Sequence, residues 1–274
     1  MADQIPPTAA ASVLQTNGPF PSFEELVDAG ESLRISPDAR LRWALNEPFP
    51  QAISVMPELL VDPDTTVFEP YYQENDNPGV KEPSWHPISQ SPLTVSKISS
   101  VTIRVDPLDD WNHYYMETHR QHAEPDVQYD PAQVLFGPLP DPQDEYERAS
   151  GDKNLLRCCG QNRPRGKGTN HLVIRPRSGN YLTIHDFVST VHPYLLSRRD
   201  DILAALGNKM GREHPDPPDT KLMVVWCGRE PNALTVDNEK EWLGIFGKRK
   251  KRIKAERNPE LEENFQRYYA SICS

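Results

Sequence analysis

The sequence predicts an α+β fold, in which helices pack on a small mixed sheet. Residues 101–105, "VTIRV", alternate apolar and polar side chains, the pattern of a half-buried strand. Residues 180–206 follow a helix-capping pattern with apolar residues at helical spacing. Residues 220–228, "TKLMVVWCG", form a short apolar run of the length of a buried strand. Strands and helices thus share one region of the chain.

Charge and proline divide the 274-residue chain into two halves. Residues 1–150 hold 8 Lys or Arg against 25 Asp or Glu and carry 20 of the 28 prolines, whereas residues 151–274 hold 22 basic against 15 acidic residues. The net charges of −17 and +7 add to the −10 of the whole chain. We expect an acidic proline-rich segment over 1–80, an α+β domain over 81–250 with an acidic insertion at 106–156, and a basic linker and helix over 251–274.

The acidic segment is expected to be partly disordered and to contain two short helices. Ser22 and Glu25 have the spacing of a capping box, which predicts a helix from residue 23. Ser36 followed by Pro37 repeats a helix start and predicts a second helix over 36–45. Prolines recur from 46 to 92 and favour extended chain there. Its candidate anchors are Tyr71, Tyr72 and Trp85.

Residues 171–184 predict a strand, a turn and a short second strand before a helix. His185 and Asp186 resemble a catalytic dyad, but Thr183 and Asp186 also have the spacing of a capping box. We therefore interpret Thr183 and Asp186 as a structural cap. Pro193 is expected to kink or end this helix.

A second helix is expected to follow over 198–211, with Gly207 as a plausible stop. Near the end of the chain, Asn258 and Pro259 have the pattern of a helix start. The apolar residues that follow at helical spacing predict the amphipathic C-terminal helix.

The cysteines and histidines predict neither a metal site nor a cofactor. The four cysteines include the adjacent pair Cys158 and Cys159 and no C-x-x-C, which argues against a disulfide framework and against zinc. His113, His119 and His122 lack an H-E-x-x-H pattern and a cysteine partner in sequence. We interpret the cysteines as free thiols in a reducing compartment.

Two basic stretches are candidate contacts, with a solvated surface as the alternative for each. The segment 157–177 departs from the spacing of a phosphate loop but offers a possible contact for an anion or partner. Its candidate residues are Arg163, Arg165, Lys167, Arg175 and Arg177. The segment 248–254 has the composition of a nuclear import signal, carried by Lys248, Arg249, Lys250, Lys251 and Arg252.

Residues 170–247 resemble an uncharacterised domain family common in fungi. The shared pattern is a strand, a T-[IV]-x-D-[VF] helix start, a second helix, a strand and an E-W-L-G-like closing segment. The matching residues are Thr183, Ile184, Asp186, Phe187, Glu241, Trp242, Leu243 and Gly244. The resemblance implies a small α+β domain and no assigned chemistry.

No set of acid, base, nucleophile or metal ligands converges in the sequence, which favours a non-enzymatic protein-binding or scaffold module. One alternative is a hydrolase or transferase with a site assembled from distant residues. The other is a nucleic-acid-binding protein that uses segments 157–177 and 248–254. The chain lacks an apolar run of membrane-spanning length and a secretory signal, so we expect no membrane contact and a cytoplasmic or nuclear location.

Overall fold

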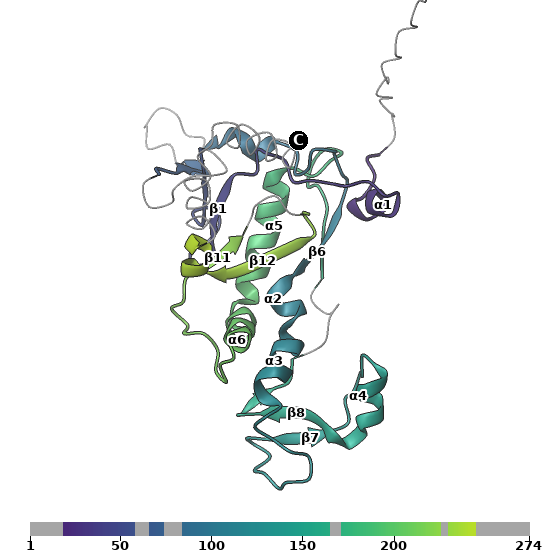
Figure 1. Ribbon diagram of the computed structural model, residues 1–274. Helices are drawn as coiled ribbons and strands as arrows, with labels where there is room; N and C mark the ends of the chain where they lie inside the picture. Colours follow the sequence, from purple (N-terminus) through teal and green to yellow (C-terminus); the bar gives the residue numbers. More distant parts are fainter. Residues whose placement is uncertain (1–18, 58–65, 74–83, 165–170, 226–229, 245–274) are drawn as a thin grey trace, which may run out of the picture.

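A seven-stranded mixed sheet organises the chain in the computed structural model, which describes residues 19–57, 66–73, 84–164, 171–225 and 230–244 (Figure 1). The strand order is β10-β6-β12-β11-β1-β2-β3. Only β12 and β6 pair in parallel, so the sheet is mixed and the α+β prediction is confirmed. The strands are β1 (Leu41–Ala44), β2 (Ile53–Val55), β3 (Glu69–Pro70), β6 (Val101–Val105), β10 (Leu172–Ile174), β11 (Leu222–Val225) and β12 (Ala233–Asn238).

The sequence predicted β6, β10 and β11 but not β1. Residues 36–45 were expected to form a helix, and this prediction is wrong because β1 lies there. Leu41, Trp43 and Leu45 are buried while the residues between them are half-buried, a period of two that outweighs the cap signal at Ser36. Strands β1, β2 and β3 all precede residue 81, so the sheet begins earlier in the chain than the expected domain boundary.

Helix α5 (Ile184–Ser197) begins with the capping box that the sequence indicated. The Asp186 backbone N–H donates to Thr183 Oγ1 at 3.1 Å, and the Thr183 N–H donates to Asp186 Oδ2 at 3.1 Å. The other carboxylate oxygen of Asp186 accepts the Arg177 N–H at 3.1 Å. Both oxygens of Asp186 are therefore engaged by the backbone around the helix start.

Neither of the two expected residues ends its helix: Pro193 does not end α5, and Gly207 does not end α6 (Arg199–Lys209). Pro193 lies inside α5, which continues to Ser197. Leu195 beyond the proline is fully buried in the core, and burial of a leucine side chain, about 1.5–3 kcal/mol, offsets much of the roughly 3 kcal/mol that an internal proline costs. Gly207 lies inside α6.

The expected second strand before α5 is reduced to a single bridge between Pro92 and Thr183.

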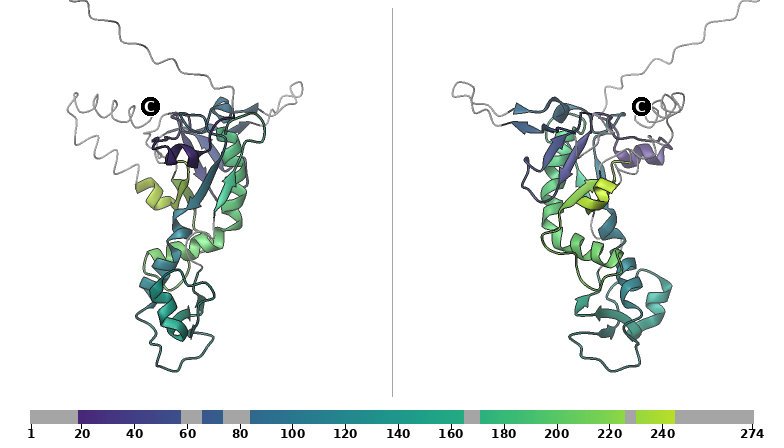
Figure 2. Two further views of the ribbon diagram at one scale, coloured as in Figure 1. Left: turned by 90° about the vertical axis from the view of Figure 1, so that its right-hand side faces the viewer. Right: turned by 60° about the vertical axis from the view of Figure 1, so that its left-hand side comes forward.

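Helix α5 lies along one face of the sheet, and α6 follows it at one end of the sheet, next to α2 (Asp106–Asp109) and α3 (Trp111–His119) (Figures 1 and 2). One large apolar core joins them to the strands. Trp43 of β1 is buried against Phe187 of α5. The indole Nε1 of Trp43 donates to His192 Nδ1 at 3.0 Å. The short elements α1 (Phe23–Asp28), β4 (Tyr72–Gln73), β5 (Ser84–Trp85) and η1 (Pro87–Gln90) complete this part, which we call the body.

Residues 111–163 form a lobe that projects from one end of the body (Figures 1 and 2). After α2, whose Leu108 is buried in the body core, the lobe runs through α3 to a three-stranded sheet. The acidic insertion expected at 106–156 is not a surface addition to the domain, because it starts inside the body core at Leu108 and forms a second core of its own. The remaining lobe elements are β7 (Leu135–Gly137), α4 (Glu145–Ser150), η2 (Gly151–Lys153), β8 (Asn154–Cys158) and β9 (Gln161–Asn162).

Several predictions fall on residues outside the described ranges: residues 1–18, Arg165 and Lys167, the basic run 248–254 and the C-terminal helix. Among the helices of the described ranges, none combines the length and the apolar character that crossing a bilayer requires.

Candidate metal centre

Two histidines of the lobe lie one helical turn apart where α3 ends. His119 is the last residue of α3, and the chain turns so that the His122 N–H donates to the His119 carbonyl at 3.0 Å. The turn keeps both imidazoles on one side of the chain, 5.7 Å apart between ring centroids. Tyr115, one turn earlier on α3, packs against His119 and donates its hydroxyl to the Gln161 carbonyl at 3.1 Å. Tyr115 thus ties the histidine helix to strand β9.

Two cysteines face these histidines from a tight hairpin. Strands β8 and β9 pair Cys158 with Gln161, which leaves Cys159 and Gly160 as a two-residue turn. Both turn residues have positive φ, 51° and 75°, as a type I′ hairpin turn requires. Adjacent residues of a strand point to opposite faces. Because Cys159 leaves the strand conformation, the two sulfur atoms instead lie 3.7 Å apart on the same side.

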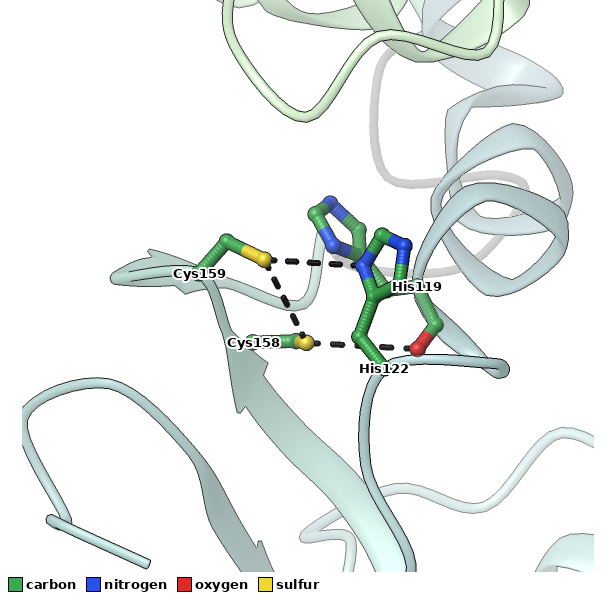
Figure 3. Close-up of side chains that lie close together, drawn as sticks. All are labelled: His119, His122, Cys158 and Cys159. Atoms are coloured by element: carbon green, nitrogen blue, oxygen red, sulfur yellow. Dashed lines mark hydrogen bonds between the residues drawn. The ribbon is translucent and has the colours of Figure 1, made fainter.

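The four side chains have nearly the spacing of a tetrahedral zinc site (Figure 3). Zn–S bonds of about 2.3 Å and Zn–N bonds of about 2.0 Å imply about 3.8 Å between two sulfur ligands and about 3.5 Å between sulfur and nitrogen. Cys158 Sγ lies 3.7 Å from Cys159 Sγ, which lies 3.6 Å from His122 Nδ1. All four ligand atoms lie within 4.8 Å of one another, so closing the tetrahedron requires shifts of about 1 Å.

His119 carries the clearest sign that a ligand belongs at this centre. Its side chain is fully buried, and neither ring nitrogen has a hydrogen-bond partner among the described residues. A buried polar atom without a partner costs about 1–3 kcal/mol. A metal ion bound by one ring nitrogen would remove part of this cost.

Without a cation the centre favours uncharged side chains. Burial lowers the pKa of His119, and the neighbouring imidazole of His122 lowers it further. Burial raises the pKa of Cys158, and burial together with the neighbouring Cys158 thiol raises the pKa of Cys159 to about 12. A neutral imidazole is the form that binds metal, and a divalent ion displaces thiol protons on binding. The same raised pKa values argue against a reactive thiolate nucleophile.

A disulfide between the cysteines is a poor alternative, and both are free thiols. Disulfides join Cα atoms about 4.4–6.8 Å apart, whereas consecutive Cα atoms are about 3.8 Å apart across a trans peptide. Two thiolates with two imidazoles are a donor set typical of tetrahedral Zn²⁺. Four protein ligands fill that coordination shell, which is the arrangement of a structural zinc site.

Of the basic residues predicted as contacts, Arg163, Arg175 and Arg177 lie within the described ranges, and none of them belongs to this centre. The Arg163 side chain is 7% exposed and forms an ion pair with Glu147. Its Nε also donates to Asn112 Oδ1 at 2.8 Å, so Arg163 has a structural role within the lobe. Arg175 and Arg177 are exposed just after β10.

The histidine of the apparent dyad is also far from the cysteines in the fold. His185 packs against Trp85 at 4.4 Å between ring centroids, in an aromatic cluster of the body. Its Nδ1 lies 3.4 Å from the Tyr71 hydroxyl. Of the candidate anchors, Tyr71 is fully buried in the body core, whereas Trp85 is partly exposed. A thiol-dependent enzyme site would require His185 to contact Cys159, and His185 contacts Tyr71 and Trp85 instead.

The sequence reading named all four residues of the centre but did not combine them. Zinc motifs usually separate paired cysteines by two to four residues, and here the separation is zero. The usable signal was Gly160 after an apolar strand, because glycine marks turns. Cys-Gly is not one of the residue pairs that specify a two-residue hairpin, so this signal gives the turn but not its type.

Fold and centre together define an α+β protein with a Cys2His2 cluster in a projecting lobe. In comparisons with protein-family models, with curated proteins and with solved structures, nothing matches this chain.

Proposed function

We propose that the protein binds one Zn²⁺ through His119, His122, Cys158 and Cys159, and that this ion stabilises the lobe of a non-enzymatic protein-binding module. The observation that carries the proposal is the convergence of four zinc-type side chains at nearly tetrahedral spacing. The ion would join the end of α3 to the β8–β9 hairpin, the two segments that border the small lobe core.

The lobe also offers surface suited to a protein partner. Val127, Leu135 and Tyr146 are large apolar side chains exposed on it, and the Tyr146 side chain is 74% exposed. Tyrosine is enriched where proteins bind each other. A closed set of four ligands leaves no position for a substrate, which favours binding over catalysis.

The nucleic-acid alternative has less support, since the Arg163 guanidinium is held by Glu147. An intracellular location is consistent with the proposal, because a reducing compartment keeps two adjacent thiols available to a metal.

Elemental analysis of the purified protein tests the metal proposal. After dialysis against ZnCl2 we expect one zinc per chain, and visible absorption bands of tetrahedral cobalt when Co²⁺ replaces zinc. His119→Asn and Cys158→Ser should abolish both signals. His113→Asn is the control on the same helix, because the His113 side chain is 65% exposed and lies outside the cluster.

Cys227→Ser repeats the cysteine substitution elsewhere in the chain and should retain the metal. Absence of bound zinc in the wild-type protein, or equal loss from His113→Asn and His119→Asn, would contradict the proposal. The binding role is tested by comparing the proteins captured on immobilised wild-type and Tyr146→Ser chains. If the wild-type and Tyr146→Ser chains capture the same proteins, and a chelator does not change this result, the lobe is excluded as the binding surface.

A further inference from the structure

We infer that Glu213 is a positioning residue for the metal centre, one that orients His122 and ties the centre to the body. This inference rests on the proposed zinc site. The two nitrogens of His122 face different partners: Nδ1 lies 3.6 Å from Cys159 Sγ, and Nε2 lies 3.4 Å from a carboxylate oxygen of Glu213. With a metal on the Cys159 side, Nδ1 is the ligand and Nε2 carries the proton.

A carboxylate behind a metal-bound histidine is a recurring arrangement. It accepts the proton of the second ring nitrogen, fixes the tautomer and makes the ligand nitrogen more basic. The Glu213 oxygen needs to approach by about 0.5 Å to reach hydrogen-bond distance. The side chains of His122 and Glu213 are 33% and 46% exposed, so the contact lies at the rim of the centre.

Glu213 belongs to the body, in the loop that follows α6, and backbone contacts hold this loop in place. The Arg212 N–H donates to the Gly207 carbonyl at 2.9 Å, and the Asp216 N–H donates to the Leu203 carbonyl at 3.0 Å. Gly207 itself is required for this fold-back, since a Cβ there would collide with the backbone of His214. The loop is therefore anchored to α6 both before and after Glu213.

Asn208 aligns this loop with the helix that carries His119. Its side chain is buried, and Nδ2 donates to the Arg212 carbonyl at 3.0 Å while Oδ1 accepts the Trp111 indole N–H at 2.9 Å. Its backbone carbonyl accepts the Thr118 hydroxyl at 3.0 Å, immediately before His119. One residue thus fixes both the helix of the first histidine and the loop behind the second.

The placement has a functional consequence. Both ligand-bearing segments, the end of α3 and the β8–β9 hairpin, belong to the lobe. Among the ion pairs of the described residues, Glu213 is the body residue that contacts a ligand side chain. Metal binding therefore depends on the seating of the loop at 210–218 against α6, and loss of the metal removes one restraint between lobe and body.

Zinc affinity of the full-length protein, measured by competition with a chromophoric chelator, tests the inference. We expect Glu213→Ala to weaken zinc binding about 10–100-fold with one zinc still bound at saturation. Glu213→Gln keeps an oxygen acceptor and should fall between wild type and Glu213→Ala. The tetrahedral cobalt spectrum should persist in both variants, because the four ligands remain.

The chain offers a matched control in Glu117, which lies 3.4 Å from His113 on α3 and is likewise exposed. Glu117→Ala removes the same type of contact from a histidine outside the centre, and it should leave zinc affinity unchanged. Gly207→Ala displaces the loop without changing any polar side chain near the metal and should also weaken binding.

The outcomes separate the inference from the function on which it rests. If wild-type protein binds zinc and Glu213→Ala and Glu213→Gln bind it as tightly as Glu117→Ala, Glu213 has no positioning role. If the wild-type protein binds no zinc, the proposed function itself fails. Circular dichroism of Glu213→Gln identifies any loss of affinity that is caused by unfolding of the chain.

Discussion

The body and the lobe are stabilised in different ways. Among the described residues, the main core of the body contains 32 buried apolar residues in one cluster, whereas the lobe core has four: Tyr115, Ala123, Leu155 and Cys158. Small cores supply little stability, and small domains usually add metals or disulfides. One of the four lobe core residues is also a candidate metal ligand, so in the lobe the apolar core and the metal centre are continuous. Sheet packing thus determines the body, whereas the small lobe core leaves the lobe to gain stability from the proposed zinc ion.

The largest expected effect is on the body. Phe187 of α5 is fully buried and packs edge-on against Trp43. Phe187→Ala should lower the free energy of unfolding by about 3–5 kcal/mol, because it removes a large apolar side chain and leaves a cavity. Urea denaturation followed by circular dichroism measures the loss. Zinc stoichiometry should stay at one per chain, and a parallel loss of zinc would show that the two regions are not separable.

A cavity in the lobe core should destabilise the lobe alone, and bound metal should reduce this destabilisation. Leu155 is 4% exposed in the lobe core, and Leu155→Ala should cost about 2–5 kcal/mol within the chelated lobe. Limited proteolysis should then cut the lobe faster in chelator than in zinc. Leu135→Ala on the paired strand β7 is the control, because Leu135 is exposed and its truncation should change little. Equal cleavage of both variants would contradict the separate lobe core.

A smaller effect is expected at the helix caps. Thr183→Ala removes the acceptor of the Asp186 N–H and should cost about 1 kcal/mol. Ser22→Ala makes the same change at α1, a six-residue helix that buries only Phe23. It should lower the melting temperature less than Thr183→Ala does. The reverse order would show that α5 does not depend on its cap.

The mildest perturbation is pH, and it acts on the body through His192. Burial lowers the pKa of His192, which accepts the Trp43 indole N–H and faces the Glu47 carbonyl at 3.0 Å. His192 binds a proton more readily in the unfolded chain than in the folded one. Its contribution to the free energy of unfolding is therefore complete above the ordinary histidine pKa of about 6.5, and it declines as pH falls toward the lower folded pKa. Urea midpoints of chelated protein at several pH values measure the decline. If the urea midpoint of His192→Gln depends on pH with the same slope as that of the wild type, His192 is not the cause of the decline.

Local patterns predicted the parts of the fold that local interactions determine. The capping box at Thr183 and the alternation from Val101 to Val105 are properties of neighbouring residues, and both elements are present. The segment around Trp43 carried two competing signals, and pairing with β2 and β11 decided between them. The pairing with β11 joins residues that are far apart in sequence, and this contact is what the local pattern around Trp43 lacked.

The metal centre required information that sequence spacing lacks. His122 and Cys159 are 37 positions apart, and their contact depends on the hairpin turn and on the end of α3. The left-handed conformation of Cys159 brings adjacent sulfur atoms to one side, and no standard spacing describes this arrangement. Gly160 indicates a turn after β8, but the position of that turn opposite two histidines follows only from the fold.

Hydrogen exchange followed by mass spectrometry, with and without a chelator, tests the central claim most directly. If a zinc ion stabilises the lobe, chelation should remove amide protection across residues 111–163, and added ZnCl2 should restore it. The body strands β6, β11 and β12 should keep their protection under both conditions. Unchanged exchange in the lobe on chelation, or an equal loss throughout lobe and body, would contradict the account.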